Sequence, residues 1–419
     1  MRASTLRRSL AGSGKPGWRV AALAAAAVVL ANPVAAHADI TTATTTLQSS
    51  ATSDVPQNPG VVGLVRSGDS IQYVSAGNGQ VNPNVPADPK ATFRIGSVTK
   101  TFTAAVVLQL EAEHKLSLAD TVDTKLPGLI QNLASYTAPA VQGLYPDTPM
   151  TTKGIYDGKS ITIRQLLGHR SGLPNHTDDL LPGPFDSPGK SGYPYSEISL
   201  VNDALHLDKP SGTGVINGDH GYHYSNTNFV LAGMIVEAVT GHSLQTEIQN
   251  RIITPLGLKN TTYPTGPAMV GNTAGNYLHG YVANPFNPWF DESLDNPSLF
   301  GGSGAIISNL DDLSTFVHAL LDGQLLPGPQ LAELKTTVPI ADAFIDYSNY
   351  SLGLGQVTGL SCGSGWGHDG VLWGYFTSWI ANDDGSKQVI LFTNRQDGQT
   401  GIFANTGIAV QARDAFCKL

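Results

Sequence analysis

The stretch Phe93-Arg-Ile-Gly-Ser-Val-Thr-Lys-Thr-Phe102 decides how this chain of 419 residues is interpreted. Its first part, residues 92–95, is predicted as a short strand, and a helix is predicted to open at Ser97. No Gly or Pro interrupts the chain from there until Pro127. Ser97 and Lys100 are separated by slightly less than one helical turn of about 3.6 residues, so a helix would place both side chains on one face.

A serine hydroxyl beside a lysine on one helix face has the elements of a nucleophile. Burial lowers the pKa of a lysine, and the neutral amine can then take the proton of the hydroxyl. The N-terminus of the helix also favours developing negative charge. The Ser-x-x-Lys pattern is common, however, and fits an N-cap serine followed by a solvated lysine equally well.

Two further segments carry residues suited to the same chemistry. Tyr224-Ser-Asn226 precedes an apolar helical segment, and His368-Asp-Gly370 is predicted to lie in a Gly-rich turn that leads into a strand. A tyrosine can exchange a proton, and an asparagine amide can hold a substrate carbonyl. Gly370 would let a strand approach a substrate closely. Each segment alone is more often structural than catalytic.

The three motifs together, in this order, resemble the penicillin-recognising serine hydrolases, which include class C β-lactamases, D-alanyl-D-alanine carboxypeptidases and related esterases and D-amidases. The resemblance covers nearly all of the chain after about residue 60 and includes Leu166-Leu-Gly-His-Arg-Ser-Gly-Leu173. The Ser361-Cys-Gly363 segment and Cys417 look most like the secreted streptomycete-type carboxypeptidases. The resemblance implies a D-alanyl-D-alanine carboxypeptidase or related D-peptidase. The alternatives are an esterase or D-amino-acid amidase and, less favoured, a non-catalytic penicillin-binding sensor.

The family resemblance implies a role for each residue of the first two motifs. Ser97 is the nucleophile that becomes acylated, and Lys100 and Tyr224 share its activation and the return of the proton to the leaving group. Asn226 holds the acyl-side amide of the substrate. The intact Ser97, Lys100 and Tyr224 argue against a sensor, because a binding protein needs no activated nucleophile.

The third motif departs from the family pattern. His368 fills a position that is lysine in β-lactamases and histidine in the carboxypeptidases, and it is assigned to the catalytic group. The backbone N–H of Val371 would complete an oxyanion hole with that of Ser97. Asp369 and Val371 replace two threonines, and Gln356 stands near the place of the family's arginine. These residues and Gly370 form the predicted substrate-binding set with Asn226.

The charge around the third motif bears on specificity. No Lys or Arg occurs between Lys335 and Lys387. An uncompensated Asp369 would repel a free carboxylate on the substrate. Because Asp369, Val371 and Gln356 differ from the family pattern, the sequence does not determine which leaving group is preferred. The residues that form the acyl-enzyme are intact.

The order of predicted elements indicates an α/β fold. Strand patterns at both chain ends, residues 60–126 and 300–419, predict an antiparallel sheet flanked by helices, and residues 127–299 predict an inserted, mainly helical domain. A hairpin is expected over residues 61–75, and a final helix over about 402–417. The long segments 131–160 and 182–194 are expected to be functional lids or disordered loops.

The N-terminal 38 residues have the pattern of a secretory signal peptide. A cationic segment is followed by the apolar residues 20–30 and by Ala36-His-Ala38, a small-residue cleavage site. The apolar core is about half the roughly 20 residues of a membrane span, so a secreted protein without a span is expected after cleavage. Arg7-Arg8 leaves the choice between Sec and twin-arginine export open. Residues 39–59 are rich in Thr, Ser and Ala and predict a flexible leader.

The two cysteines, Cys362 and Cys417, both lie in the part expected to be exported. Two thiols in an oxidising compartment pair most simply with each other, and the related carboxypeptidases join the corresponding positions. Two free buried cysteines are the less favoured alternative.

Composition limits the partners. The chain has 24 Lys and Arg against 33 Asp and Glu, a net charge of -9, so a nucleic-acid partner is excluded. No metal or other cofactor is expected, because His176, His220 and His223, with Asp178 and Asp179, lack a recognised ligand spacing. The expected partner is a small peptide or ester substrate, in the family's range of peptidoglycan stem peptides and β-lactams, and a monomer is expected.

One sequence pattern points to a different class of hydrolase. Gly359-Leu-Ser-Cys-Gly363 matches the G-x-S-x-G elbow of α/β-hydrolases. That elbow must lead from a strand into a helix, whereas a Gly-rich turn toward His368 follows here. We therefore favour Ser97 over Ser361 as the nucleophile.

Overall fold

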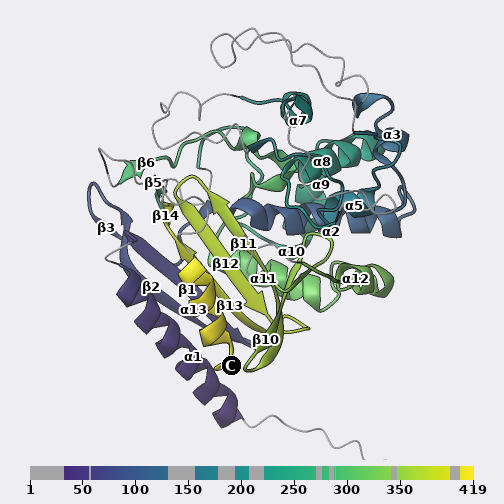
Figure 1. Cartoon of the computed structure of the whole chain (residues 1–419). Helices are drawn as coiled ribbons and strands as arrows, with labels where there is room; N and C mark the ends of the chain where they lie inside the picture. Colours follow the sequence, from purple (N-terminus) through teal and green to yellow (C-terminus); the bar gives the residue numbers. More distant parts are fainter. Residues whose placement is uncertain are drawn as a thin grey trace, which may run out of the picture.

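The computed structural model describes residues 33–55, 58–130, 156–177, 194–206, 221–269, 276–282, 287, 289–340, 347–396 and 406–419. Its centre is an antiparallel sheet of nine strands with the order β3-β2-β1-β13-β12-β11-β10-β9-β8 (Figure 1). In that order the strands are β3 (Val85–Pro86), β2 (Ser70–Gln80), β1 (Gly60–Ser67), β13 (Lys387–Thr393), β12 (Tyr375–Ala381), β11 (Gly363–Leu372), β10 (Gly355–Leu360), β9 (Asn349–Tyr350) and β8 (Val338–Pro339).

The two ends of the chain meet in the middle of this sheet. β1 pairs with β13 over seven residues, from Val61 opposite Thr393 to Ser67 opposite Lys387. β1 and β2 form the predicted hairpin around the turn at residues 68–69. The expected sheet built from both chain ends is therefore confirmed.

Helices cover both faces of the sheet, and the alternation of side chains decides which residues they meet. On β1, Val62 and Leu64 point into one hydrophobic core, and Val61 and Val65 point into a second core on the opposite face. The first core contains α2 (Thr99–Ala112) and α11 (Leu310–Leu321), whose Phe102 and Phe316 rings stack with centroids 3.6 Å apart. The second core contains α1 (Pro33–Asp54) and α13 (Thr406–Phe416).

Helix α1 corrects the prediction of a flexible leader over residues 39–59. It runs to Asp54 along β1 and β2 and buries one face completely against the sheet. That face consists of Ile40, Ala43, Leu47 and Ala51. Gly63 of β1 lies under Leu47, whose Cδ2 would be 3.0 Å from any Cβ built there. The spacing of the buried residues is helical, but alanines supply half of them.

The predicted strand over residues 92–95 lies outside the large sheet. It is β4 (Phe93–Arg94), which pairs with β7 (Ile307–Ser308). This pairing fixes the residues just before Ser97 against residues 307–308, which follow the mainly helical middle of the chain. The helix predicted to open at Ser97 begins with a 3₁₀ turn, η1 (Gly96–Val98), and continues as α2.

The middle of the chain is mainly helical, with α8 (Thr227–Thr240) buried at its centre. The other described elements of residues 122–303 are α3 (Val122–Lys125), α5 (Ile163–Leu167), α7 (Glu197–His206), α9 (Leu244–Ile248), a π-helical turn η3 (Gln249–Ile253), α10 (Thr254–Leu256), β5 (Tyr281–Val282), β6 (Phe290–Asp291), η4 (Pro297–Leu299) and η5 (Gly301–Ser303). Farther along the chain lie α12 (Gly328–Leu334) and β14 (Arg395–Gln396). The boundaries proposed for the inserted domain stay predictions. The long segments at 131–155 and 182–193 lie outside the described residues.

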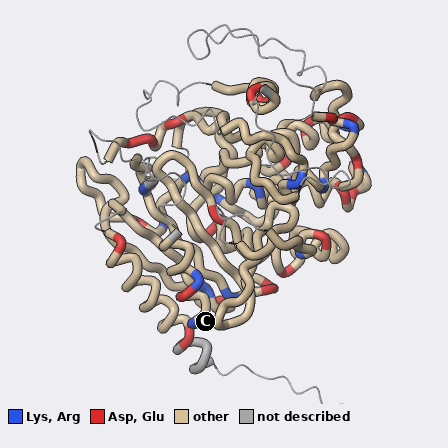
Figure 2. Tube along the Cα trace, in the orientation of Figure 1, with Lys and Arg blue, Asp and Glu red and all other residues tan. Residues whose placement is uncertain are grey.

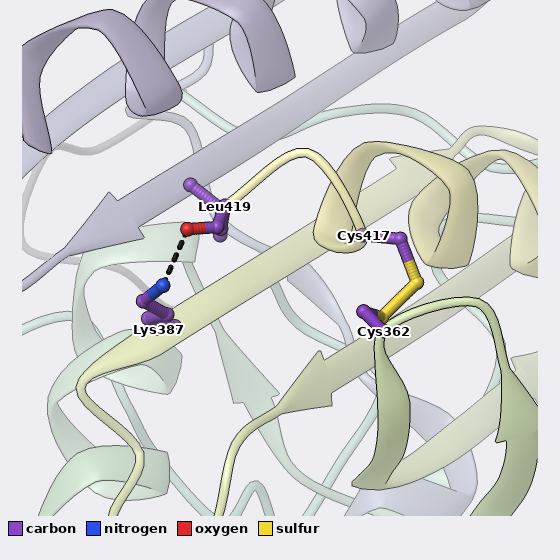
Figure 3. The surroundings of a disulfide bond; sticks show 4 residues. All are labelled: Cys362, Lys387, Cys417 and Leu419. Atoms are coloured by element: carbon purple, nitrogen blue, oxygen red, sulfur yellow. Dashed lines mark hydrogen bonds between the residues drawn. A yellow bond between two sulfur atoms is a disulfide. The ribbon is translucent and has the colours of Figure 1, made fainter. Parts of the chain in front are cut away.

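Cys362 and Cys417 form a disulfide, with a Cα–Cα distance of 5.2 Å. Figure 3 shows that it joins the turn between β10 and β11 to the end of α13. Beside it, the Lys387 ammonium donates a hydrogen bond to the carbonyl of Leu419. The last helix is therefore fixed to the sheet at two points, on the face opposite to α2.

The charged residues are spread along the chain. In Figure 2 the Lys and Arg positions are few and interspersed with Asp and Glu. Within the described part of the chain, no helix is long and apolar enough to cross a membrane.

Candidate active site

Four segments that are distant in sequence meet around Ser97. They are η1 with the start of α2, the segment that enters α8, the turn η5, and strand β11. α2 contacts α8 and η5, and β11 lies along η1. The fold thus brings all three predicted motifs together.

Lys100 is completely buried, and its Nζ atom is held by three oxygen atoms. It lies 2.8 Å from Ser97 Oγ, 2.6 Å from Asn226 Oδ1 and 2.8 Å from the carbonyl oxygen of Ser303. None of these partners is a carboxylate. Burial therefore lowers the pKa of Lys100 well below its usual value without an anion to offset the effect.

Tyr224 brings a phenol to the same serine. Its hydroxyl hydrogen-bonds Ser97, and its ring centroid lies 4.8 Å from Lys100 Nζ. Burial raises the pKa of Tyr224 above its usual value, so the phenol keeps its proton and can donate it.

Asn226 occupies the N-cap position of α8, but its side chain does not cap the helix. Its Oδ1 accepts from Lys100, and its Nδ2 donates to Thr177 Oγ1 over 3.0 Å. Its backbone N–H donates to Asn175 Oδ1 over 3.0 Å. In this structure the amide predicted to hold the substrate therefore positions the lysine.

The backbones of η1 and β11 approach each other closely. Gly96 has φ +51°, and a Cβ atom there would lie 2.8 Å from the Val371 nitrogen. A Cβ atom on Gly370 would lie 1.9 Å from the Ile95 oxygen and 3.2 Å from the Ser97 nitrogen. β10 pairs with β11 no further than Gly367. The rest of β11 is therefore free to run beside the backbone of Ser97, as an oxyanion hole would require.

The third motif lies within strand β11, rather than in a turn before a strand as predicted. His368 is buried, and both of its ring nitrogens have partners. Nδ1 lies 2.6 Å from the carbonyl oxygen of Asp369, and Nε2 lies 2.9 Å from the Tyr350 hydroxyl. A carbonyl can only accept, so Nδ1 carries the proton and Nε2 accepts from Tyr350. Burial and the nearby Lys100 lower the pKa of His368 to about 3, which keeps the ring neutral.

Asp369 has Tyr347 as a neighbour, and its charge also reaches the active site, because burial and then the charge of Asp369 raise the pKa of Tyr224. Asp369 alternates with His368 along the strand, so its carboxylate faces the α13 side of the sheet. There it hydrogen-bonds Tyr347, whose ring lies 5.9 Å from the guanidinium carbon of Arg413. The neighbouring Val371 packs against the core on that same face. A cation from the last helix thus lies near the acid, which residue order around the motif could not reveal.

Gln356 lies on β10 and its amide oxygen is already occupied. It accepts from Asn349 Nδ2 over 2.8 Å and faces Thr337 Oγ1 at 3.4 Å. Its predicted contact with substrate stays a prediction.

The described residues contain neither of the two alternative sites. Ser361 lies in the turn between β10 and β11, so the strand-to-helix elbow of an α/β-hydrolase is absent at this position. His176 is buried between Thr227 Oγ1 at 3.1 Å and the Leu299 carbonyl at 2.8 Å, which makes it a structural histidine. Among the described residues no group of His, Cys, Asp or Glu could hold a metal ion. His220, Asp178 and Asp179 lie outside them.

Sequence reasoning missed several residues that surround the motifs. Ser303 holds Lys100 through a backbone carbonyl, which leaves no trace in side-chain patterns. Tyr350 reaches the site from strand β9, and Thr177 reaches it through its hydroxyl contact with Asn226. His169 belongs to the Leu166–Leu173 motif, from which the resemblance implies no role for it, and its ring lies 4.3 Å from that of Tyr224.

Comparison with known proteins agrees with this site. A family model described as Beta-lactamase matches residues 50–413. The chain therefore belongs to the Beta-lactamase family, and the fold and site define a serine hydrolase.

Among curated proteins, the chain is 29% identical to an unguisins hydrolase from Aspergillus campestris over 64% of its length. It is 26% identical to a penicillin-binding protein from Bacillus subtilis over 81% of its length. The matched parts span 46% and 68% of those two proteins.

Among solved structures, a D-stereospecific amidohydrolase from Streptomyces sp. is 33% identical, with a TM-score of 0.69. That match covers 84% of this chain and 94% of the amidohydrolase. The D-amino acid amidase from Ochrobactrum anthropi SV3 is 22% identical, with a TM-score of 0.72 over 90% of this chain and 98% of the amidase. The second likeness shows the fold alone.

Proposed function

We propose that this protein hydrolyses amides and peptides of D-amino acids through an acyl-enzyme on Ser97. The observation that carries the proposal is the buried Lys100, which contacts the Ser97 hydroxyl and has no carboxylate partner. This arrangement serves proton transfer, because a permanently charged lysine would be stabilised by an anion.

The two other contacts of Lys100 fix the direction of that transfer. Asn226 Oδ1 and the Ser303 carbonyl can only accept hydrogen bonds. A neutral amine has two N–H groups, which these two oxygens take, and one lone pair, which is left facing Ser97 Oγ. The Ser97 O–H therefore donates to Nζ, and the proton moves to Lys100 as Oγ forms its bond to the substrate carbonyl carbon.

The leaving nitrogen must then receive a proton as its bond to carbon breaks. Tyr224 is protonated and contacts Ser97, so it can pass its proton to the leaving amine and recover one from Lys100. The N–H groups of Ser97 and Val371 supply the oxyanion hole. Water releases the acyl group by the reverse sequence.

The choice of an amide over a carboxypeptidase substrate rests on two points. The 33% identical structure is titled a D-stereospecific amidohydrolase. In addition, strands β10 and β11 contain no Lys or Arg, and the nearby cation Arg413 lies with Tyr347 on the far side of the sheet. A free substrate carboxylate would thus lack a partner at the third motif. The runner-up is the D-alanyl-D-alanine carboxypeptidase, in line with the penicillin-binding relative.

A panel of substrates tests the proposal. Turnover of D-alaninamide, L-alaninamide and D-alanyl-D-alanine is measured with the wild type and with Ser97→Ala. We expect the D-amide to be cleaved at least about tenfold faster than the free-acid dipeptide, a difference of roughly 1.4 kcal/mol in transition-state binding. A tenfold preference for the dipeptide would favour the carboxypeptidase. A preference for the L-amide would overturn both the amidase and the carboxypeptidase hypotheses.

Covalent labelling tests the nucleophile separately. A fluorophosphonate should add one mass equivalent to Ser97 and none to the Ser97→Ala variant. Ser361→Ala is the matched control and should label like the wild type. Labelling that survives Ser97→Ala would refute the acyl-enzyme at this residue.

The proposal includes export of the enzyme from the cytoplasm. The signal-like pattern of residues 1–38 and the cystine of Cys362 and Cys417 both support an extracytoplasmic enzyme. N-terminal sequencing of the mature protein tests it, and a protein that starts at Met1 would contradict it.

A further inference from the structure

His169 occupies a backbone position that glycine normally takes. Helix α5 ends at Leu167 with Gly168 as its C-cap, and His169 follows with φ +54°. The His169 N–H bonds to the Leu166 carbonyl, and the Arg170 N–H bonds to the Gln165 carbonyl. These two bonds define a Schellman C-cap, whose left-handed residue is usually Gly because a Cβ atom destabilises that conformation. A side chain at this position therefore calls for an explanation outside the turn.

The explanation lies in what His169 contacts. Its carbonyl accepts from the N–H of His223 over 2.7 Å, and its Nδ1 accepts from the N–H of Ser225 over 3.2 Å. Its ring lies on that of Tyr224, with centroids 4.3 Å apart and planes inclined by 33°. The backbone of His169 thus holds the residue before Tyr224, and its buried side chain holds the residue after Tyr224 and the Tyr224 ring.

The hydrogen bonds also define the state of the imidazole. A backbone N–H can only donate, so Nδ1 carries no proton and the proton is on Nε2. The Asn228 side chain faces the same Nδ1 from 3.2 Å, and its Oδ1 accepts from Ser171. The buried Nε2 has no hydrogen-bond partner among the described residues. The ring is therefore neutral and oriented by its surroundings.

We propose that His169 is a positioning residue that holds the Tyr224 phenol against Ser97 for proton transfer. The inference rests on the proton-relay role proposed for Tyr224. His169 itself touches no reacting atom, and it acts by fixing the backbone and ring of Tyr224. Without it the phenol loses the packing surface and the acceptor that determine where its hydroxyl lies.

The chain supplies a matched control at the end of α2. His114 has φ +56°, with its N–H bonded to the Glu111 carbonyl and the Lys115 N–H bonded to the Leu110 carbonyl. This is the same Schellman geometry, but the His114 side chain is exposed and remote from Ser97. Glycine at either position relieves the left-handed backbone, and only the change at 169 removes contacts to Tyr224.

The experiment measures the second-order rate of Ser97 labelling by a fluorophosphonate, kcat and KM for the preferred substrate, and Tm. We expect His169→Gly to lower kcat for the amide substrate by roughly ten- to hundredfold, the effect of misplacing a catalytic group by about 1 Å, with little change in KM. His114→Gly should leave kcat and labelling unchanged. His169→Asn, which tolerates the left-handed backbone and retains an acceptor for Ser225, should recover part of the loss.

A double-mutant cycle separates positioning from general damage. In a Tyr224→Phe background, the change His169→Gly should have little further effect, because both act through one hydroxyl. If His169→Gly lowers Tm, the same cycle is run with His169→Asn. An equal loss of kcat in both backgrounds, or unchanged kcat in a folded His169 variant, would overturn the proposal for His169 while leaving Tyr224 in place. Unchanged kcat for the amide substrate in Tyr224→Phe alone would overturn the relay role and this proposal together.

Discussion

The hydroxyl of Tyr350 donates a hydrogen bond to Nε2 of His368 over 2.9 Å, at the point where the third motif faces Lys100. Because Nδ1 donates to the Asp369 carbonyl, this tyrosine is the donor that satisfies the second nitrogen. The histidine is thus fixed as a neutral tautomer and is not a cation for substrate binding. Its assignment to the catalytic group stays a prediction.

Tyr350→Phe should therefore destabilise the protein. It leaves a buried acceptor unsatisfied, which costs about 1–3 kcal/mol of unfolding free energy. Urea unfolding measures the change. The double variant Tyr350→Phe with His368→Leu should lose less than the sum of the two single variants, since the Nε2 acceptor and its Tyr350 donor are then removed together. Additive losses would show that the two side chains are not coupled.

The spacing within each motif could be predicted from the sequence because it is local, whereas the meeting of the motifs was implied by the family resemblance. Ser97 and Lys100 are on one helix face, and Tyr224 and Asn226 immediately precede another helix. The contacts that hold them come from distant backbone and loops. The Ser303 carbonyl is one example, and the position of His169 beside Tyr224 depends on a left-handed turn that no side-chain pattern announces.

In the fold, too, elements with a clear local pattern were predicted, and an element that depends on distant contacts was missed. The hairpin of β1 and β2 follows apolar alternation and was predicted correctly, whereas the His368 segment of β11 was predicted as a Gly-rich turn. Helix α1 was missed because its buried face uses Ala43 and Ala51 with few larger side chains, and its other residues are mostly Thr and Ser. Such a helix gains its stability from the sheet beneath it rather than from its own propensity.

Lys100 predicts the pH dependence of acylation. Burial lowers its pKa, and only the neutral amine can accept the Ser97 proton. The rate of Ser97 labelling should therefore rise with pH through the lowered pKa and level off above it, well below pH 10.5. Lys100→Arg should abolish labelling across the whole range, because arginine stays protonated. A pH-independent rate in the wild type would contradict this role.

The same shift has a consequence for stability. The folded-state pKa of Lys100 lies below the unfolded value of 10.5, so between the two values the unfolded state binds the extra proton. The free energy of unfolding should rise with pH across that window through this group. Comparing unfolding curves of the wild type and Lys100→Met over pH 7 to about 10 isolates the contribution. Identical slopes would show that the pKa is not lowered.

Asp369 is expected to support the strand rather than select the leaving group. Its hydrogen bond with Tyr347 keeps the carboxylate on the α13 face. Asp369→Asn should thus leave the ratio of D-amide to free-acid turnover within about twofold, since a carboxylate on the α13 face makes no direct contact that differs between the two substrates. The measurement is the same substrate panel, with Tyr347→Phe as a second probe of the contact. A tenfold shift of this ratio toward the free acid would show that Asp369 does repel the substrate carboxylate, as the sequence predicts.

The disulfide should contribute to stability more than to catalysis. It closes a loop with a sequence separation of 55 between Cys362 and Cys417, and such a bridge adds roughly 2–4 kcal/mol on the chain-entropy model. Cys362→Ser with Cys417→Ser should lower Tm, while Ser97 labelling at 25 °C stays close to the wild type. A variant with unchanged Tm would show that the bridge does not constrain the unfolded chain.

Gly370 offers the most direct test of the oxyanion hole. A methyl group there would lie 1.9 Å from the Ile95 carbonyl oxygen, far inside any allowed contact, so β11 must move away from η1. That shift separates the Val371 and Ser97 backbones, and loss of one oxyanion donor lowers kcat by roughly a hundred- to a thousandfold. Gly370→Ala should therefore lose turnover by about that factor while KM changes little. The control is Gly407→Ala in α13, where a Cβ atom meets nothing within 4 Å; it should keep full activity. Full turnover in a folded Gly370→Ala enzyme would mean that the oxyanion is stabilised elsewhere.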